Sequence, residues 1–234
     1  MSHHYFAKSH IMKLIVLFVA TFASILFCHA QHNITQLDTL LCELGRKDQH
    51  VRINLNNAVQ NGKIDSIVIY AQEMELIDQT NQNHVKKILQ RGVPDNLSID
   101  AYKALFLIVD HADVKYQEQH FKHIKRLSTS GHIANHDIAT LKDRILMNKG
   151  RKQLYGTQTR AKHIVITTED ATPHITNYVW PVRNPRKLDI RRSKAGLGTM
   201  QQQATAHKHT GYDMVFDPTL SKRDILSLTS KDND

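Results

Sequence analysis

Apolar residues recur at intervals of three and four positions through most of the first 150 residues, and this spacing constrains the fold more than any other feature. Such a period places the apolar side chains on one face of an α-helix. Gly62, Gly92 and Gly150 follow these apolar stripes as helix stops. The pattern predicts five helices, at about 34–61, 66–91, 98–112, 115–130 and 135–149.

The pattern changes after Gly150. Short runs of β-branched and aromatic residues at Gln153–Thr159, Lys162–Thr168 and Ile175–Val182 are typical of strands. A sheet of two or three strands is only marginally stable alone, so we expect helices to cover one of its faces. We therefore predict a mainly α (α+β) fold, in which a small antiparallel sheet, at about 153–182, packs at one end of a bundle of about five helices.

Residues 1–30 are expected to be a signal peptide. Lys13 precedes the apolar run Leu14–Phe27, and the run ends in the small-residue segment Cys28–Ala30. The run is shorter than the roughly 18–20 residues that a membrane-spanning helix needs. We therefore expect export to the periplasm or the extracellular space. Cleavage after Ala30 is favoured over lipid attachment at Cys28, because bulky Phe27 precedes that cysteine.

The chain after the signal peptide fits one mainly helical domain at 31–200, followed by a polar C-terminal extension at 201–234. Cleavage removes two lysines and no acids, so the net charge falls from +9 to +7, and Met12 is an alternative start to Met1. Cys42 is the one cysteine left, which excludes an internal disulfide. The basic residues are scattered among acids and amides, so we expect no nucleic-acid partner, and no transmembrane segment after cleavage.

Charged and amide side chains fall on or beside the core-facing helix stripes and in the sheet region. We hypothesise that they converge where the sheet meets the bundle and form a pocket lined by both signs of charge. His111 would be the general acid or base there, because an unperturbed pKa of about 6.5 suits proton transfer near neutrality. Asp143 would orient it or share its proton. The expected ligand-binding residues are Asp48, Arg52, Asp78, Asn81, Arg144, Gln153, Tyr155, Gln158, Arg191 and Arg192.

A purely structural role is the competing interpretation of this polar set. Buried ions are normally paired and hydrogen-bonded, so Asp and Arg side chains on helix faces would satisfy each other. Gln153 and Gln158 would pair with backbone groups where the strand leaves the helix, and Gly156 would serve a turn that needs a positive φ.

Other common kinds of site are not predicted. His120 and His123 lie three positions apart on a helix, but no acid or thiol accompanies them at the spacing of metal ligands. The sequence also has no Gly-x-Ser-x-Gly elbow and no glycine-rich phosphate loop. We therefore expect no metal and no cofactor.

The polar motifs resemble those of a bacterial family, domain-of-unknown-function family 6624. The resemblance covers roughly Ile34–Met200. Its most specific parts are Asp143-Arg144, the run Tyr155-Gly156-Thr157-Gln158, and Arg191-Arg192 followed by Gly196-Leu197. Val93 departs from the family pattern, in which an aromatic residue is commoner. The resemblance implies that these residues act as one set, and it implies no known activity.

Two function classes follow. The first is an exported bacterial binding or scaffold module whose expected partner is a small polar or anionic ligand. The alternative is a periplasmic, hydrolase-like enzyme that acts on such a ligand with His111 and Asp143 as its acid/base pair. Both remain open at this point.

Overall fold

The computed structural model describes the backbone of residues 2–163, 175–208 and 212–230, and the side chains of 31–162, 176–207 and 213–230. Within these ranges the chain forms eight α-helices and three strands, which confirms the predicted mainly helical fold with a small sheet. It divides into two compact units. The first holds residues up to Ile77 with Arg91–Leu105, and the second holds Asp78–Gln90 with the residues from Phe106 onward.

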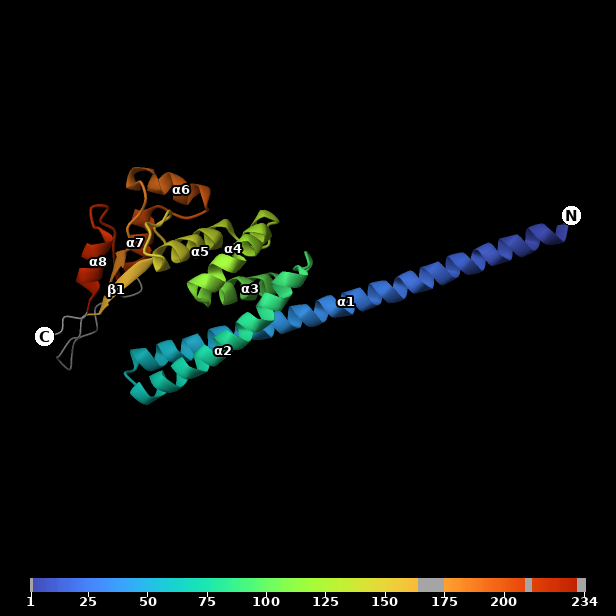
Figure 1. Ribbon diagram of the computed structural model, residues 1–234, viewed down its shortest axis with the longest axis horizontal. Coiled ribbons are helices and arrows are strands. Elements are labelled where there is room, and N and C mark those ends of the chain that lie inside the picture. Colours follow the sequence, from blue (N-terminus) through green and yellow to red (C-terminus); the bar gives the residue numbers. More distant parts are fainter. Residues whose placement is uncertain (1, 164–174, 209–211, 231–234) are drawn as a thin grey trace. The chain divides into compact units, whose positions relative to one another are not determined.

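The first unit is built from α1 (Ser2–Gln60), the beginning of α2 (Ile64–Arg91) and the beginning of α3 (Ile99–His111) (Figure 1). The helix predicted from Ile34 is therefore the later part of a longer one. Gly45 allows α1 and α3 to approach closely, since a methyl group on it would lie 2.5 Å from Cβ of Ala104. Asp38 on α1 accepts the backbone N–H of Ser98 at 2.6 Å, so the first helix also anchors the start of the third.

Among the residues whose side chains are described, no helix is both long enough and apolar enough to cross a membrane. The side chains of 2–30 lie outside this range, so the predicted signal peptide stays a prediction.

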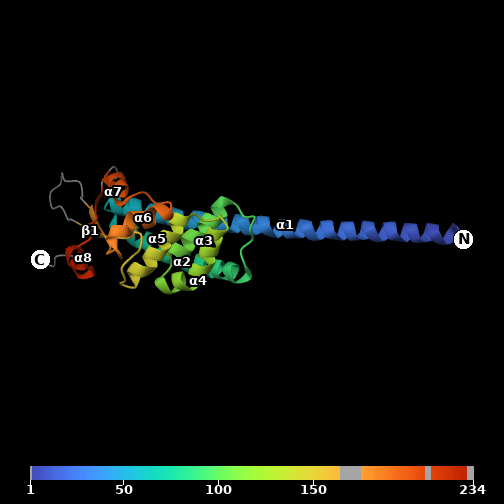
Figure 2. The ribbon, with the colours of Figure 1, turned by 90° about the horizontal axis from the view of Figure 1, so that it is seen from above.

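The second unit contains the end of α2 and of α3, then α4 (Val114–Thr129) and α5 (Asn135–Asn148). Figure 2 shows α4 and α5 side by side, and the two helices are in contact. Their stripes supply fully buried side chains, among them Ile124 and Leu141. Asp113 starts α4 by accepting the N–H of Tyr116 at 2.9 Å. Gly150 has a φ of +65° just after α5, as the predicted helix stop requires.

The sheet is mixed, which corrects the predicted antiparallel one. β1 (Thr159–His163) pairs antiparallel with β2 (Ile175–Val179), and β2 pairs in parallel with β3 (Tyr212–Val215). A parallel pair needs a crossover connection. Here the crossover runs through a 3-10 turn (Pro185–Lys187), α6 (Leu188–Lys194) and α7 (Met200–Lys208), and α8 (Lys222–Thr229) then packs on β1.

The predicted strand at 153–159 is wrong except at its ends. Gln153 makes only an isolated bridge with Val182, and the strand proper begins at Thr159. Residues 164–168 of the second predicted strand lie outside the described residues. Buried Val179, Leu188 and Met214 share an apolar cluster with Val182 and Met200, so the segment from 200 onward contributes to the core of this unit. The predicted domain boundaries themselves stay predictions.

Candidate functional site

The site is built around the loop Gln153–Gln158, which we call the 153–158 loop. Asp143, a completely buried residue on α5, accepts the backbone N–H groups of Leu154, Tyr155 and Thr157 at 2.7, 2.9 and 3.2 Å. It also accepts the Thr157 hydroxyl at 3.1 Å. Burial raises the pKa of the Asp143 carboxyl, and these four donated hydrogen bonds oppose that rise. The carboxylate thus fixes the course of the loop that follows its own helix.

The side chain of Gln153 links the two ends of the loop by hydrogen bonds. Its buried side-chain amide donates to the carbonyls of Gln158 at 3.0 Å and Trp180 at 2.6 Å, and its side-chain oxygen accepts the N–H of Gln158 at 3.0 Å. Both ends of the amide are therefore satisfied. Gln158 in turn contacts the Thr157 hydroxyl at 3.3 Å and the carbonyl of Thr140 on α5 at 3.5 Å.

Two arginines on α6 hold the carbonyl side of the same loop. Arg192 is 1% exposed and donates to the carbonyls of Tyr155 and Gly198 at 2.7 and 2.6 Å, and to the Gln203 amide oxygen. Burial lowers the pKa of Arg192, and Asp189 and Asp143 oppose this. Arg191 donates to the carbonyl of Leu154 at 2.8 Å. The structure therefore brings together at one loop the predicted residues Asp143, Gln153, Tyr155, Gln158, Arg191 and Arg192.

An open pocket lies beside this loop. Its volume is about 280 Å³, and it is bounded by α4, the start of α5, Tyr155 and α6. Three of its lining side chains are cationic, namely Lys125, Arg191 and Lys194, and none is acidic. The remaining lining residues are polar or apolar and uncharged: Ser128, Thr129, Asn135, Ile138, Ala139, Tyr155 and Ala195. The pocket therefore offers a positive surface to a small molecule.

The model of a family of unknown function, DUF6624, matches residues 35–210, which is most of the chain. The chain belongs to the DUF6624 family. This match confirms the resemblance drawn from the polar motifs. No curated protein and no solved structure matches the chain. The family match includes the whole 153–158 loop and both arginines of α6.

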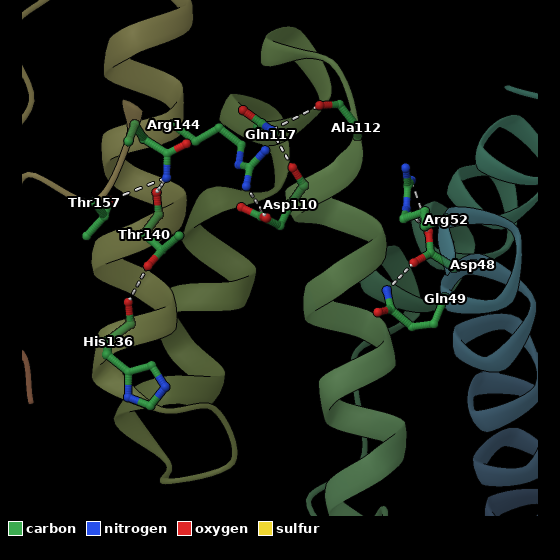
Figure 3. A network of polar contacts seen from close by, with 11 residues as sticks. Asp48, Gln49, Arg52, Asp110, Ala112, Gln117, His136, Thr140, Arg144 and Thr157 are labelled. Atoms are coloured by element: carbon green, nitrogen blue, oxygen red, sulfur yellow. Dashed lines mark hydrogen bonds and ion pairs between the residues drawn. The ribbon is translucent and has the colours of Figure 1, made fainter. Parts of the chain in front are cut away.

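Another predicted residue of this DUF6624 protein, Arg144, lies in a separate network (Figure 3). Its guanidinium contacts Asp110 on α3 at 3.0 Å. Gln117 on α4 donates to the carbonyls of Asp110 and Ala112 at 2.8 and 2.9 Å, and so fixes the turn from α3 to α4 (Figure 3). Burial raises the pKa of Asp110, and Arg144 opposes this. The network joins three helices through buried Asp110 and Gln117 and half-buried Arg144.

Sequence reasoning missed Asp110 and Gln117, which are 4% and 1% exposed. A signal for Asp110 was present, since it interrupts the apolar run Ala104–Val109 immediately before His111. The sequence carries no such signal for Gln117, because an amide side chain on an amphipathic helix is usually exposed.

Asp48 and Arg52 belong to the first unit and pair with each other there. Arg52 donates to Asp48 Oδ1 at 3.2 Å, and Gln49 donates to Oδ2 at 2.7 Å (Figure 3). This is the local pairing that the structural interpretation predicts. In the second unit, Asn81 is buried and Asp78 and His111 are half-buried. Within the described part of this unit, none of these three lines the pocket.

His120 on α4 is a buried titratable group outside the pocket. It is 2% exposed, and within the described part of the chain neither ring nitrogen has a hydrogen-bond partner. The Tyr116 and His123 rings lie 4.3 and 5.9 Å from it, centroid to centroid. Burial lowers the pKa of His120, and the nearby His123 and Lys86 lower it further. The described residues contain no group of three acids, thiols or imidazoles that could hold a metal.

Proposed function

We propose that the second unit of this DUF6624 protein binds a small anionic ligand in the pocket beside the 153–158 loop. The observation that carries the proposal is the lining of the pocket, in which Lys125, Arg191 and Lys194 meet no acidic residue. Within the described part of the chain, neither lysine ammonium group forms an ion pair or a hydrogen bond. Cations gathered without counter-charges repel one another, and an anion would relieve that repulsion.

The rigidity of the 153–158 loop supports a binding role. Its N–H groups are held by Asp143 and its carbonyls by Arg191 and Arg192. A wall that is already ordered loses little conformational freedom when a ligand binds. The interior hydrogen bonds therefore act as support for the surface that Tyr155 and Arg191 present to the pocket.

We favour this role over the acid/base alternative because of the contacts of Asp143. Its carboxylate already accepts four hydrogen bonds, about as many as an ionised carboxylate has lone-pair sites. A group so occupied is poorly suited to take a proton from a substrate or to orient an imidazole. His111 keeps its place in the alternative as a prediction from the sequence.

Calorimetric titration of the full chain with inorganic phosphate, sulfate and acetate at low ionic strength tests the binding proposal. Replacing Lys125 and Lys194 together by Ala should weaken the tightest of these interactions by tenfold or more, since hydrogen bonds to charged groups contribute about 1.5–3 kcal/mol each. The matched control replaces Lys122 and Lys187 by Ala. Both are exposed and neither lines the pocket, so the net charge changes equally. Equal weakening in the two variants would refute the proposal.

We further propose that the protein is exported. The charged start, the apolar run Leu14–Phe27 and the small residues before Gln31 support this. The test is N-terminal sequencing of protein recovered from the envelope and culture fractions of its bacterial host. The expected first residue is Gln31, and a chain that keeps its first thirty residues in the cytosol would contradict export.

A further inference from the structure

The hydrogen bonds that Arg191 already makes indicate which chemical class of anion the pocket binds. Its Nε donates to the carbonyl of Leu154 at 2.8 Å, Nη1 donates to the carbonyl of Asn184 at 3.2 Å, and Nη2 donates to the carbonyls of Arg183 and Asn184. These four hydrogen bonds leave one of the five N–H groups of the guanidinium. Arg191 lines the pocket, but both two-pronged edges of its guanidinium are occupied by backbone carbonyls.

This occupation disfavours a carboxylate ligand. Two parallel N–H groups of one arginine match the plane of a carboxylate, and Arg191 has no such pair to offer. A phosphate can use the same pair, but lysine ammonium groups also bind it as point charges. The other two cations, Lys125 and Lys194, are ammonium groups, which act as point charges on flexible stems and impose no planar geometry. The pocket thus offers single hydrogen-bond donors rather than two parallel N–H groups of one arginine.

The donors also reach the pocket from different elements. Lys125 lies on α4, Lys194 on α6, and Tyr155 in the 153–158 loop. The Tyr155 hydroxyl has no hydrogen-bond partner within the described residues, and its backbone is fixed by Asp143 and Arg192. Single donors arriving from several directions suit a tetrahedral group with three terminal oxygens. A phosphate monoester carries a charge of about −1.5 to −2 at neutral pH, which matches three cations better than one carboxylate does.

We infer that the pocket takes a phosphate monoester carried by a small molecule, with Lys125, Lys194 and the Tyr155 hydroxyl as its donors. This rests on the proposed anion-binding function. The volume of about 280 Å³ lies at the small end of ligand pockets, so it fits a small phosphorylated compound.

The test is calorimetric titration of the full chain at pH 7.5 with glycerol phosphate and with malonate, a dicarboxylate of similar charge. Glycerol phosphate should bind at least tenfold more tightly. Tyr155→Phe should weaken glycerol phosphate several-fold and leave the affinity for malonate nearly unchanged. Tyr178→Phe is the control, because Tyr178 is a similarly half-buried tyrosine of the same unit that does not line the pocket.

The outcomes separate the two claims. Malonate binding as tightly as glycerol phosphate would overturn the phosphate assignment and leave anion binding in place, whereas binding of neither compound would overturn both. Equal effects of Tyr155→Phe and Tyr178→Phe would overturn the role of the hydroxyl. A third titration uses vesicles that contain phosphatidic acid. Preference for the vesicles over glycerol phosphate would identify a lipid headgroup as the source of the phosphate and overturn the small-molecule assignment.

Discussion

Asp143 and Arg192 hold the two polar groups of one residue, because Asp143 accepts the N–H of Tyr155 at 2.9 Å and Arg192 donates to its carbonyl at 2.7 Å. Both side chains are almost completely buried. The two side chains form no direct ion pair with each other. Within the described residues, all the donors to Asp143 belong to the 153–158 loop, whereas Arg192 donates to the carbonyls of Tyr155 and Gly198 and to the Gln203 amide oxygen. The position of Tyr155 at the pocket therefore depends on two opposite charges that act through a single residue of the chain.

Replacing Asp143 by Asn should destabilise the second unit by about 2–3 kcal/mol. An amide offers one acceptor oxygen, and its NH₂ group would face at least one backbone N–H of the loop, which would then be left unpaired. Urea unfolding, monitored by the fluorescence of Trp180, measures this loss of stability. Trp180 is the one tryptophan of the sequence, and its carbonyl accepts a hydrogen bond from Gln153. Glu118→Gln is the control, since it removes an exposed carboxylate whose ion pair with Lys149 contributes about 1 kcal/mol or less.

Replacing Arg192 by Lys should also destabilise this unit, by about 3 kcal/mol, although the charge is kept. One ammonium group cannot reach the carbonyls of Tyr155 and Gly198 and the amide of Gln203 together, so buried acceptors lose their donor. The same Trp180 unfolding assay applies. Arg186→Lys, at an exposed position of the 3-10 turn, should change the midpoint little. A stable Arg192→Lys variant would show that the three contacts do not act together.

The helices could be predicted from the sequence, whereas the sheet could be predicted only in part. The stripe of Ile138, Leu141, Ile145 and Leu146 repeats at helical spacing and specifies α5 by local information alone. β3 carries no such pattern, because four residues in a polar segment become a strand only through pairing with β2 after the crossover.

The polar residues of the candidate site were identified from the sequence, but their contacts were not. Periodicity shows that Asp143 faces the core, yet it does not show that its partners are backbone N–H groups of the following loop rather than an arginine or a histidine. A pocket lined by both signs of charge was predicted, and the two lysines of the observed pocket were missed for a related reason. Lys125 and Lys194 are exposed lysines of the kind that every soluble surface carries, and only the fold gathers them next to Arg191.

Gly156→Ala should destabilise the second unit by more than the same change at Gly131. Both glycines have a positive φ, of +69° and +81°, which costs an L-residue about 1 kcal/mol. A methyl group on Gly156 would also lie 3.0 Å from the sulfur of Met200, whereas one on Gly131 would meet nothing within 4 Å. The difference between the two variants in the free energy of unfolding isolates the crowding. Equal losses would mean that Met200 moves aside without cost.

Acidification from pH 7.5 to 5.5 should weaken the second unit through His120. Its pKa in the folded protein is lowered, chiefly by burial, below the ordinary value of 6.5. Between those two pKa values the unfolded chain binds the proton and the folded chain does not, so stability falls as the pH falls. The loss begins near pH 6.5 and is complete below the lowered folded pKa. Unfolding midpoints measured by Trp180 fluorescence across this range record it.

His120→Phe should flatten this pH dependence, because the ring keeps its packing against Tyr116 and can no longer take up a proton beside Lys86 and His123. The variant should also gain stability at every pH, since two buried nitrogens without hydrogen-bond partners are removed. His84→Gln, at an exposed position of α2, controls for the loss of a histidine as such and should keep the slope of the parent protein. An unchanged slope in His120→Phe would assign the pH dependence to other groups, and lower stability at pH 7.5 would show that the imidazole nitrogens are satisfied in solution.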